Sequence, residues 1–315
     1  MESSVARRSA ARALRTDRLF LGVVYGSGAL FVILVALLFL ELLRGSWESI
    51  VKFGPAFLWT SQWNPVTEQF GALPLIFGTV VSSLIAIVLA GVVGIFAAAY
   101  LSEFAPSWLA RPLSFVIELL AAVPSVVYGL WGLFVLAPFI RTTLGPLLQH
   151  TLGFLPIFSG PIYGVGLLTA GIILAFMILP TVTAISRDVI IAIPKELREA
   201  SMSLGATKWE TVRRVVLPAA RAGIFGALVL ALGRAMGETI ATTMVIGNRP
   251  EIAVSLFAPS YTLSSVIANE FTEATSPLYT SALFELGFLL LLVSAVVNGL
   301  ARIMMWTVFR QRSSA

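Results

Sequence analysis

The chain has 315 residues, of which 58% are hydrophobic and 12% are charged, and its mean hydropathy is +0.93. Soluble domains carry about 25% charged residues, so this composition excludes an ordinary soluble protein and predicts a polytopic membrane protein. The absence of cysteine excludes disulfides and cysteine-based metal or redox sites.

The first 18 residues form a basic tail directly ahead of a long apolar run. The tail carries five arginines: Arg7, Arg8, Arg12, Arg15 and Arg18. A basic cluster beside an apolar segment is typical of the cytoplasmic flank of a membrane span. The net charge of +5 therefore indicates membrane topology rather than binding to nucleic acid. The run from Leu19 to Leu40 is too long for the apolar part of a secretory signal peptide, and we expect it to be a retained span.

Six segments reach the roughly 20 apolar residues that a transmembrane helix needs. We place them near residues 19–43, 75–101, 113–140, 163–186, 222–246 and 282–308. Sixteen of the 21 basic residues then fall on one side of the membrane and four on the other, with one inside a span. The fold expected is all-α with six transmembrane helices, and the positive-inside rule predicts that both termini lie in the cytoplasm.

Three regions follow from these spans. Residues 1–18 are the basic cytoplasmic tail. Residues 19–74 hold the first span and a periplasmic interfacial segment rich in Trp and Phe, and residues 75–311 form the main transmembrane domain. Pro124 and Gly129 predict a kink or hinge in the third span.

A hydrophilic segment, residues 194–218, lies between the fourth and fifth spans, inside a predicted cytoplasmic loop at 187–221. We call residues 194–218 the knob. Its first helix is expected to end at Gly205, because glycine suits the left-handed residue that closes a helix. Thr207 and Glu210 have the spacing of a capping box, which predicts a second helix that ends at Pro218. Each helix has one apolar face, so the knob is suited to binding another protein in the cytoplasm.

The fifth span contains Arg234 and Glu238 among otherwise nonpolar residues. A charge at the centre of a bilayer costs roughly 2.5–3.5 kcal/mol on insertion scales. On a continuous helix these two residues share a face and can partly neutralise each other, with the Thr239 hydroxyl nearby. One interpretation is that Arg234 lines a polar pathway and binds a tetrahedral oxyanion; the alternative is a structural ion pair. Glu118, in the third span, lies either on this pathway or close enough to the cytoplasmic end to reach water.

Motifs for catalysis are missing from the sequence. It contains no G-x-x-x-x-G-K-[ST] phosphate loop, no H-E-x-x-H zinc motif and no nucleophile elbow, and it has a single histidine. We therefore expect no catalytic residue, no metal site and no cofactor on this chain. A translocating subunit driven by something outside its own chain fits these absences best.

Several positions of the knob follow the pattern of a known family. They are Glu199, Ala200, Ser201, Gly205, Val215, Leu217 and Pro218, with Ser201 where the pattern usually has a second alanine. This spacing resembles the EAA loop of bacterial ABC importer permeases, which docks onto the ATPase subunit. The resemblance implies that these residues couple the chain to an ATPase, and that the fold is that of a type I, MetI-like ABC importer permease.

Four further stretches resemble the phosphate permeases of the PstC type. They are residues 65–74, 117–129, 233–239 and 266–271, and the likeness covers most of the chain from about residue 50 onward. This resemblance implies a heterodimer with a sister permease, PstA, in the lipid of the bacterial inner membrane. It also implies a homodimer of the ATPase PstB, which binds ATP and magnesium, and a periplasmic phosphate-binding protein. Arg234 and Glu238 would correspond to charged residues that serve phosphate translocation.

The expected function is ATP-driven import of inorganic phosphate by alternating access. Three alternatives remain open: a permease for another oxyanion such as sulfate, molybdate or phosphonate, a non-transporting membrane sensor or scaffold, and an ion-driven secondary transporter. Phosphate and sulfate both present tetrahedral oxygens, so one bidentate arginine cannot separate them. We therefore expect selectivity to reside mainly in the soluble binding protein.

Overall fold

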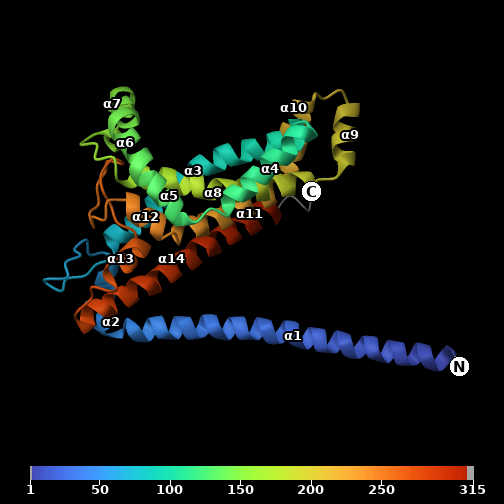
Figure 1. Cartoon of the computed structure of the whole chain (residues 1–315), viewed down its shortest axis with the longest axis horizontal. Coiled ribbons are helices and arrows are strands. Elements are labelled where there is room, and N and C mark those ends of the chain that lie inside the picture. Colours follow the sequence, from blue (N-terminus) through green and yellow to red (C-terminus); the bar gives the residue numbers. More distant parts are fainter. Residues whose placement is uncertain (1, 311–315) are drawn as a thin grey trace.

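The computed structural model describes the backbone of residues 2–310 and the side chains of residues 20–304, so the side chains of the basic tail lie outside the described part. Within it, long helices run side by side and shorter ones cover the two ends (Figure 1). The α-helices are α1 (Glu2–Gly45), α2 (Trp47–Phe53), α3 (Leu73–Ala99), α4 (Ser107–Ala121), α5 (Ser125–Trp131), α6 (Ala137–Phe139), α7 (Gly145–Leu152), α8 (Leu167–Ile191), α9 (Lys195–Ser203), α10 (Lys208–Thr211), α11 (Leu217–Met236), α12 (Ile240–Val245), α13 (Leu263–Glu270) and α14 (Pro277–Arg310). The helices α9 and α10 mark one end of the bundle, which we call the knob end; α2 and α13 mark the opposite end (Figure 1).

Six helical segments of the described chain are long and apolar enough to cross a membrane. They are Phe20–Gly45, Leu73–Phe104, Ser125–Leu152, Leu167–Ile191, Lys208–Met236 and Pro277–Met304. The prediction of an all-α fold with six spans is confirmed. The predicted third span, 113–140, has wrong bounds, because the chain breaks at residues 122–124 and leaves α4 as a separate helix. Pro124 stands at this break in an extended conformation, as expected for a hinge.

Four π-helical turns occur in the described chain, and a proline stands two residues after the end of each. The turns are η2 (Tyr100–Phe104), η3 (Gly132–Leu136), η4 (Ile140–Leu144) and η6 (Val212–Val216), followed by Pro106, Pro138, Pro146 and Pro218. A proline lacks the N–H group, and its ring crowds the carbonyl four residues earlier; at Pro138, Pro146 and Pro218, where the helix continues, the wider π turn relieves this crowding. After η2 the helix instead ends at Ala105, which is extended. The prediction that the second knob helix ends at Pro218 is therefore wrong, since the helix continues through η6 into α11.

The centre of the bundle is formed by α3, α8 and α11. Buried small and aliphatic side chains from all three helices share one hydrophobic cluster, among them Ala90, Ile178 and Ala231. Close approach depends on glycine: a Cβ on Gly171 of α8 would lie 2.5 Å from the Ile85 side chain of α3. Such small residues let membrane helices pack closely.

In contrast, α1 lies at the edge of the molecule. Its membrane-spanning part has no buried residue in the most apolar window, and it diverges from the bundle toward the N-terminus (Figure 1). Its contacts with α14 lie near its C-terminal end, where the rings of Phe39 and Phe288 are 5.0 Å apart.

The start of α8 is hydrogen-bonded to the end of α12 and the loop that follows it. The N–H groups of Gly166, Leu167 and Leu168 donate to the carbonyls of Val245, Ala258 and Leu256, at 2.9, 3.1 and 2.8 Å. The first N–H groups of a helix have no partner inside it, and here α12 and its loop supply one for each of these three.

Candidate functional site

The knob is a helix-turn-helix whose local signals act as the sequence predicts. Gly205 has φ +86°, the left-handed conformation that ends α9. Thr207 Oγ1 accepts a hydrogen bond from the N–H of Glu210, and the Glu210 carboxylate accepts one from the N–H of Thr207 at 2.9 Å. The predicted turn and capping box are both confirmed.

The apolar face of α9 is exposed. Leu197 in α9 and Leu204 directly after it share this face; both are exposed, Leu204 to 90%, and α9 contributes no buried residue. The positions expected to couple to an ATPase have different surroundings: Glu199, Ala200 and Pro218 are exposed. Ser201 Oγ lies 3.0 Å from Thr211 Oγ1 and joins the two knob helices, while Leu217 packs against the core cluster at the knob end. The knob thus presents an apolar surface that nothing in the described chain covers.

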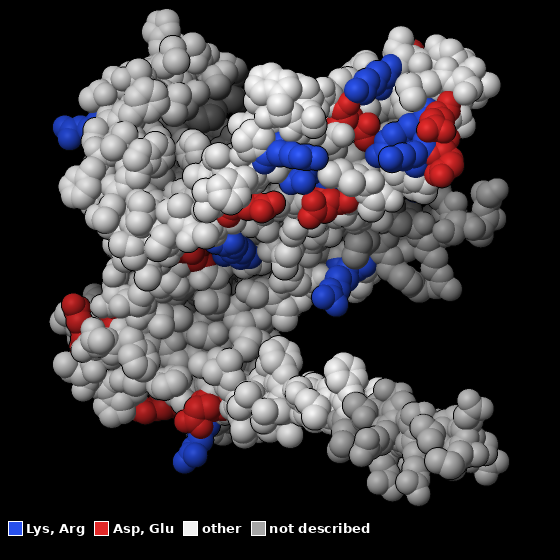
Figure 2. Space-filling model, turned by 45° about the vertical axis from the view of Figure 1, so that its right-hand side comes forward, with Lys and Arg blue, Asp and Glu red and all other residues white. Residues whose placement is uncertain are grey.

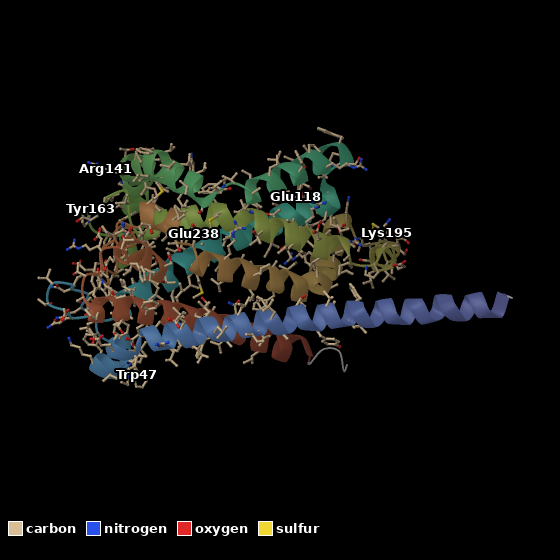
Figure 3. The ribbon with its side chains drawn as sticks, turned by 60° about the horizontal axis from the view of Figure 1, so that its bottom comes forward. Trp47, Glu118, Arg141, Tyr163, Lys195 and Glu238 are labelled. Atoms are coloured by element: carbon tan, nitrogen blue, oxygen red, sulfur yellow. The ribbon has the colours of Figure 1, made fainter. Side chains whose placement is uncertain are left out.

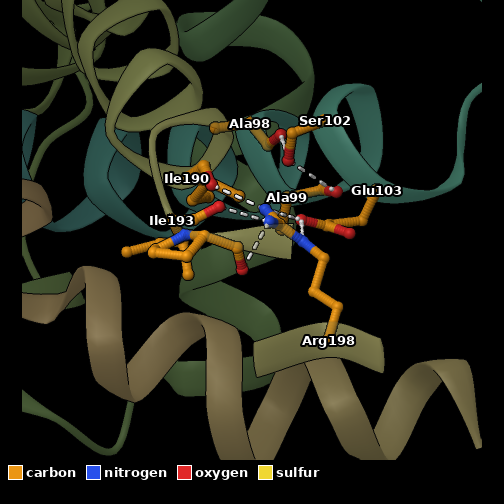
Figure 4. A network of polar contacts seen from close by, with 8 residues as sticks. Ala98, Ala99, Ser102, Glu103, Ile190, Ile193 and Arg198 are labelled. Atoms are coloured by element: carbon orange, nitrogen blue, oxygen red, sulfur yellow. Dashed lines mark hydrogen bonds and ion pairs between the residues drawn. The ribbon is translucent and has the colours of Figure 1, made fainter. Parts of the chain in front are cut away.

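An ion pair attaches α9 to the rest of the chain. Arg198 Nε and Nη2 donate to Glu103 Oε1 at 3.0 and 2.8 Å, and Glu103 lies in η2 at the end of the second span. The same guanidinium donates to the carbonyl of Ile190 in the last turn of α8 and to those of Ile193 and Pro194 in the connection that follows (Figure 4). The two side chains are 16% and 10% exposed, so the pair is largely shielded from water. Sequence reasoning missed it, since nothing local marks two residues 95 positions apart as partners.

The next residue of η2 contacts the other knob helix. The ring of Phe104 lies 6.3 Å from that of Trp209, and the Lys208 ammonium lies 5.3 Å from the Phe104 ring centre. One π turn therefore contacts both halves of the knob.

Arg234 lies in the last turn of α11 with its side chain exposed. Its Nη1 is 3.4 Å from Thr181 Oγ1 of α8. The helix ends at Met236, so the predicted helix face shared by Arg234 and Glu238 does not exist. Glu238 instead accepts a hydrogen bond from the N–H of Ala241 at 3.2 Å, at the start of α12. None of the ion pairs between described residues joins Arg234 to Glu238, and the predicted neutralisation is wrong.

The break between α11 and α12 is held from α13. Ser264 Oγ donates to the backbone carbonyl of Glu238 at 2.7 Å. Thr239 stands at the N-cap position of α12, and its Oγ1 donates to the carbonyl of Gly237 at 3.3 Å. The tertiary contact with α13 explains why local helix propensity does not carry α11 through residue 238.

Glu118 lies on α4 and not in the third span. It is 62% exposed, and Arg187 Nη1 of α8 is 3.8 Å from its Oε1. Figure 3 shows Glu118 nearer than Glu238 to Lys195 at the knob end. On the face drawn in Figure 2, charged side chains of both signs are concentrated toward that end. The structure therefore brings Arg234 and Glu118 to separate places along α8, one beside Thr181 and the other beside Arg187.

At the end of the bundle opposite the knob, the Glu270 carboxylate accepts hydrogen bonds from two aromatic side chains. Trp63 Nε1 and Tyr279 Oη both donate to Glu270 Oε2, at 2.7 and 2.6 Å, and join the segment after α2 to α14. Trp63 is buried in the core cluster there, although its region was expected to be an interfacial segment. Nearby, burial raises the pKa of Tyr261 above its ordinary value, and its hydroxyl accepts a hydrogen bond from Asn269 at 2.9 Å.

Comparison with known proteins identifies the family of the chain. The family of binding-protein-dependent transport system inner membrane components matches residues 90–305. A phosphate transport system permease protein PstC of Mesorhizobium japonicum is 48% identical over 294 residues, which are 92% of this chain and 90% of that protein. A protein of the same name from Haemophilus influenzae is 47% identical over 87% of this chain and 88% of its own length.

A solved structure has a similar fold. It is a chain of a bacterial alginate ABC transporter in complex with an alginate pentasaccharide-bound periplasmic protein, with a TM-score of 0.63 and 15% identity over 94% of this chain and 97% of that chain. The six apolar helices and the family match indicate a multi-pass inner-membrane protein. The chain belongs to the family of binding-protein-dependent transport system inner membrane components, the permease subunits of ABC importers.

Proposed function

We propose that the chain is a permease subunit for the import of inorganic phosphate. Phosphate is chosen as the substrate because the chain is 48% identical, over 92% of its length, to a relative named as a phosphate transport permease. Permeases of this family work with an ATPase and a periplasmic binding protein. For this chain the partners would be a sister permease PstA, a PstB homodimer that holds ATP and magnesium, and a phosphate-binding protein. The chain itself would hold no cofactor and catalyse no reaction.

The exposed apolar face of α9 supports the ATPase partner. Leu197 and Leu204 are exposed on one side of this short helix, away from the side on which Arg198 contacts the bundle. An exposed apolar patch beside charged residues is suited to a protein interface. In this proposal the knob and both termini face the cytoplasm, and Glu199 and Ala200 contact the ATPase.

Arg234 is the residue that we assign to the phosphate pathway. Its guanidinium is exposed on a membrane-spanning helix, with a single long hydrogen bond to Thr181 and no carboxylate partner among the described residues. A charge in that position is expensive, and a guanidinium offers paired donors that match phosphate oxygens. Thr239 and Glu238 lie at the break that follows, and Glu118 would face the pathway nearer the cytoplasm.

Alternating access would couple these two parts. ATP-driven closure of the ATPase subunits would move the knob and rearrange the spans, so that Arg234 faces the loaded binding protein first and the cytoplasm later. The non-helical residues 122–124, just before the third span, and 237–239, just after the fifth, are two places where the chain can bend.

Uptake by the reconstituted complex tests this proposal. Vesicles containing both permeases and the ATPase are supplied with ATP inside and the phosphate-loaded binding protein outside, and labelled phosphate is counted. We expect uptake that requires ATP and that excess sulfate does not suppress. Transport of sulfate, molybdate or phosphonate in place of phosphate would reject the substrate. Uptake that persists without ATP but collapses with an ion gradient would indicate a secondary transporter, and failure of any ATPase to copurify would indicate a sensor or scaffold.

A further inference from the structure

We propose that the ion pair between Glu103 and Arg198 transmits movement of α9 to the spanning helices α3 and α8. The inference rests on the proposed function, because it takes the knob as the place where an ATPase subunit binds. Figure 4 shows the Arg198 guanidinium between the Glu103 carboxylate, at the end of the second span, and the carbonyls of Ile190 and Ile193, at and just after the end of α8. One side chain therefore holds together three elements: η2, α8 and α9.

Apart from this pair, α9 is weakly attached. The only other α9 side chain that the described structure shows hydrogen-bonded to another element is Ser201, which contacts Thr211. A hollow of about 330 Å³, lined by residues of α9, α8 and η2 that include Ile191 and Met202, shows that α9 is not packed onto the ends of the spans. The connection from α8 to α9 is residues 192–194, which are not helical. A force on α9 would bend this connection if nothing else joined α9 to the bundle.

Arginine at position 198 is chemically suited to prevent that bending. A guanidinium is planar and carries five N–H donors in a fixed arrangement, and here they serve both the Glu103 carboxylate and the carbonyl of Ile190 in the last turn of α8. Because water is largely excluded from the pair, the attraction is screened less than that of a surface ion pair. The contact between Phe104 and Trp209 attaches the second knob helix to the same π turn.

The test measures coupling and not only transport. In the reconstituted complex, phosphate imported and ATP hydrolysed are counted together for the wild type, for Glu103→Gln, and for Glu48→Gln as the matched control. Glu48 is an exposed carboxylate in the first turn of α2, at the end of the bundle opposite the knob (Figure 1). We expect Glu103→Gln to retain the ATPase subunits and ATP hydrolysis, because the exposed face of α9 is unchanged. Phosphate imported per ATP should fall by about fivefold or more, the lower range of typical coupling between sites. Glu48→Gln should keep the wild-type ratio.

The outcomes separate this inference from the proposed function. A wild-type complex that imports a different anion rejects phosphate as the substrate, and the ratio is then measured with that anion. An unchanged ratio in assembled Glu103→Gln overturns the transmission role. If Glu103→Gln does not assemble, Arg198→Lys is measured instead; it keeps the positive charge but loses the paired donors, and the same fall is expected. Failure of both variants to assemble would mean that the pair is needed for folding, and that result also overturns the proposal.

Discussion

Replacement of Arg234 by alanine should abolish most phosphate uptake while the complex still assembles. The side chain is exposed and its described hydrogen bond, to Thr181, is 3.4 Å long, so its loss removes little from the folded chain. A hydrogen bond to a charged group contributes about 1.5–3 kcal/mol. If Arg234 provides one such contact to phosphate at the highest barrier, uptake should fall by about 10- to 150-fold, at about 1.4 kcal/mol for each factor of ten. Arg234→Lys should lie between, because it keeps the charge and loses the paired donors.

Arg249→Ala is the matched control for this prediction. Arg249 also loses one positive charge on substitution, but it lies in the loop after α12, pairs with Glu251 at 2.8 Å, and is exposed. Exposed pairs of this kind contribute about 0–1 kcal/mol, so uptake should stay near the wild-type rate. Uptake is measured in the vesicle assay, and copurification with the ATPase reports assembly. Wild-type uptake by assembled Arg234→Ala would refute the pathway role, whereas equal losses in both arginine variants would point to a general effect of charge.

Three further substitutions test the knob and the fold. Ala200→Arg places a bulky charge on the exposed face of α9 and should prevent copurification of the ATPase while the permease remains folded; normal binding would remove α9 from the interface. Gly78→Ala should lower the free energy of unfolding by about 1–3 kcal/mol or more, because its Cβ would lie 2.1 Å from the Tyr261 carbonyl oxygen. Gly226→Ala is the control, because open space surrounds that position and its stability should not change. Equal thermal unfolding of the two variants in detergent would contradict this packing. Glu270→Gln replaces the charged acceptor of two hydrogen bonds and should lower the free energy of unfolding by about 2 kcal/mol. An unfolding temperature equal to that of the wild type would contradict this role of Glu270.

The parts of the fold that local sequence determines were predictable. Six apolar runs predicted six spans, because a bilayer requires that length of apolar helix whatever its neighbours are. Gly205 and the Thr207–Glu210 capping box predicted the turn of the knob, because both act within a few residues of the backbone. The exposed positions of Glu199 and Ala200 are consistent with the docking role that the family resemblance implies.

One error and one omission arose where distant segments override local preference. Residues 233–239 favour a continuous helix, but Ser264 of α13 binds the carbonyl of Glu238 and the helix ends at Met236. The partnership of Glu103 with Arg198 joins two regions that only the folded bundle brings together. Both features depend on tertiary packing, which a pattern within one segment does not encode.

The error at Pro218 is local. Proline was expected to end the helix, but the π turn directly before it allows the helix to continue.

Hydrogen bonds from other elements hold α8 at both of its ends. Arg198 donates to the carbonyl of Ile190 at one end, and carbonyls between residues 245 and 258 accept from the N–H groups at the other. The 25 residues of this helix span about 37 Å, close to the thickness of a membrane. A helix held at both ends cannot move relative to its neighbours without breaking these hydrogen bonds. A displacement of the knob should therefore reach the opposite end of α8 with nearly its full amplitude. The bending that a cycle of opening and closing requires must then occur outside α8, and the non-helical residues 122–124 between α4 and α5 are one place for it.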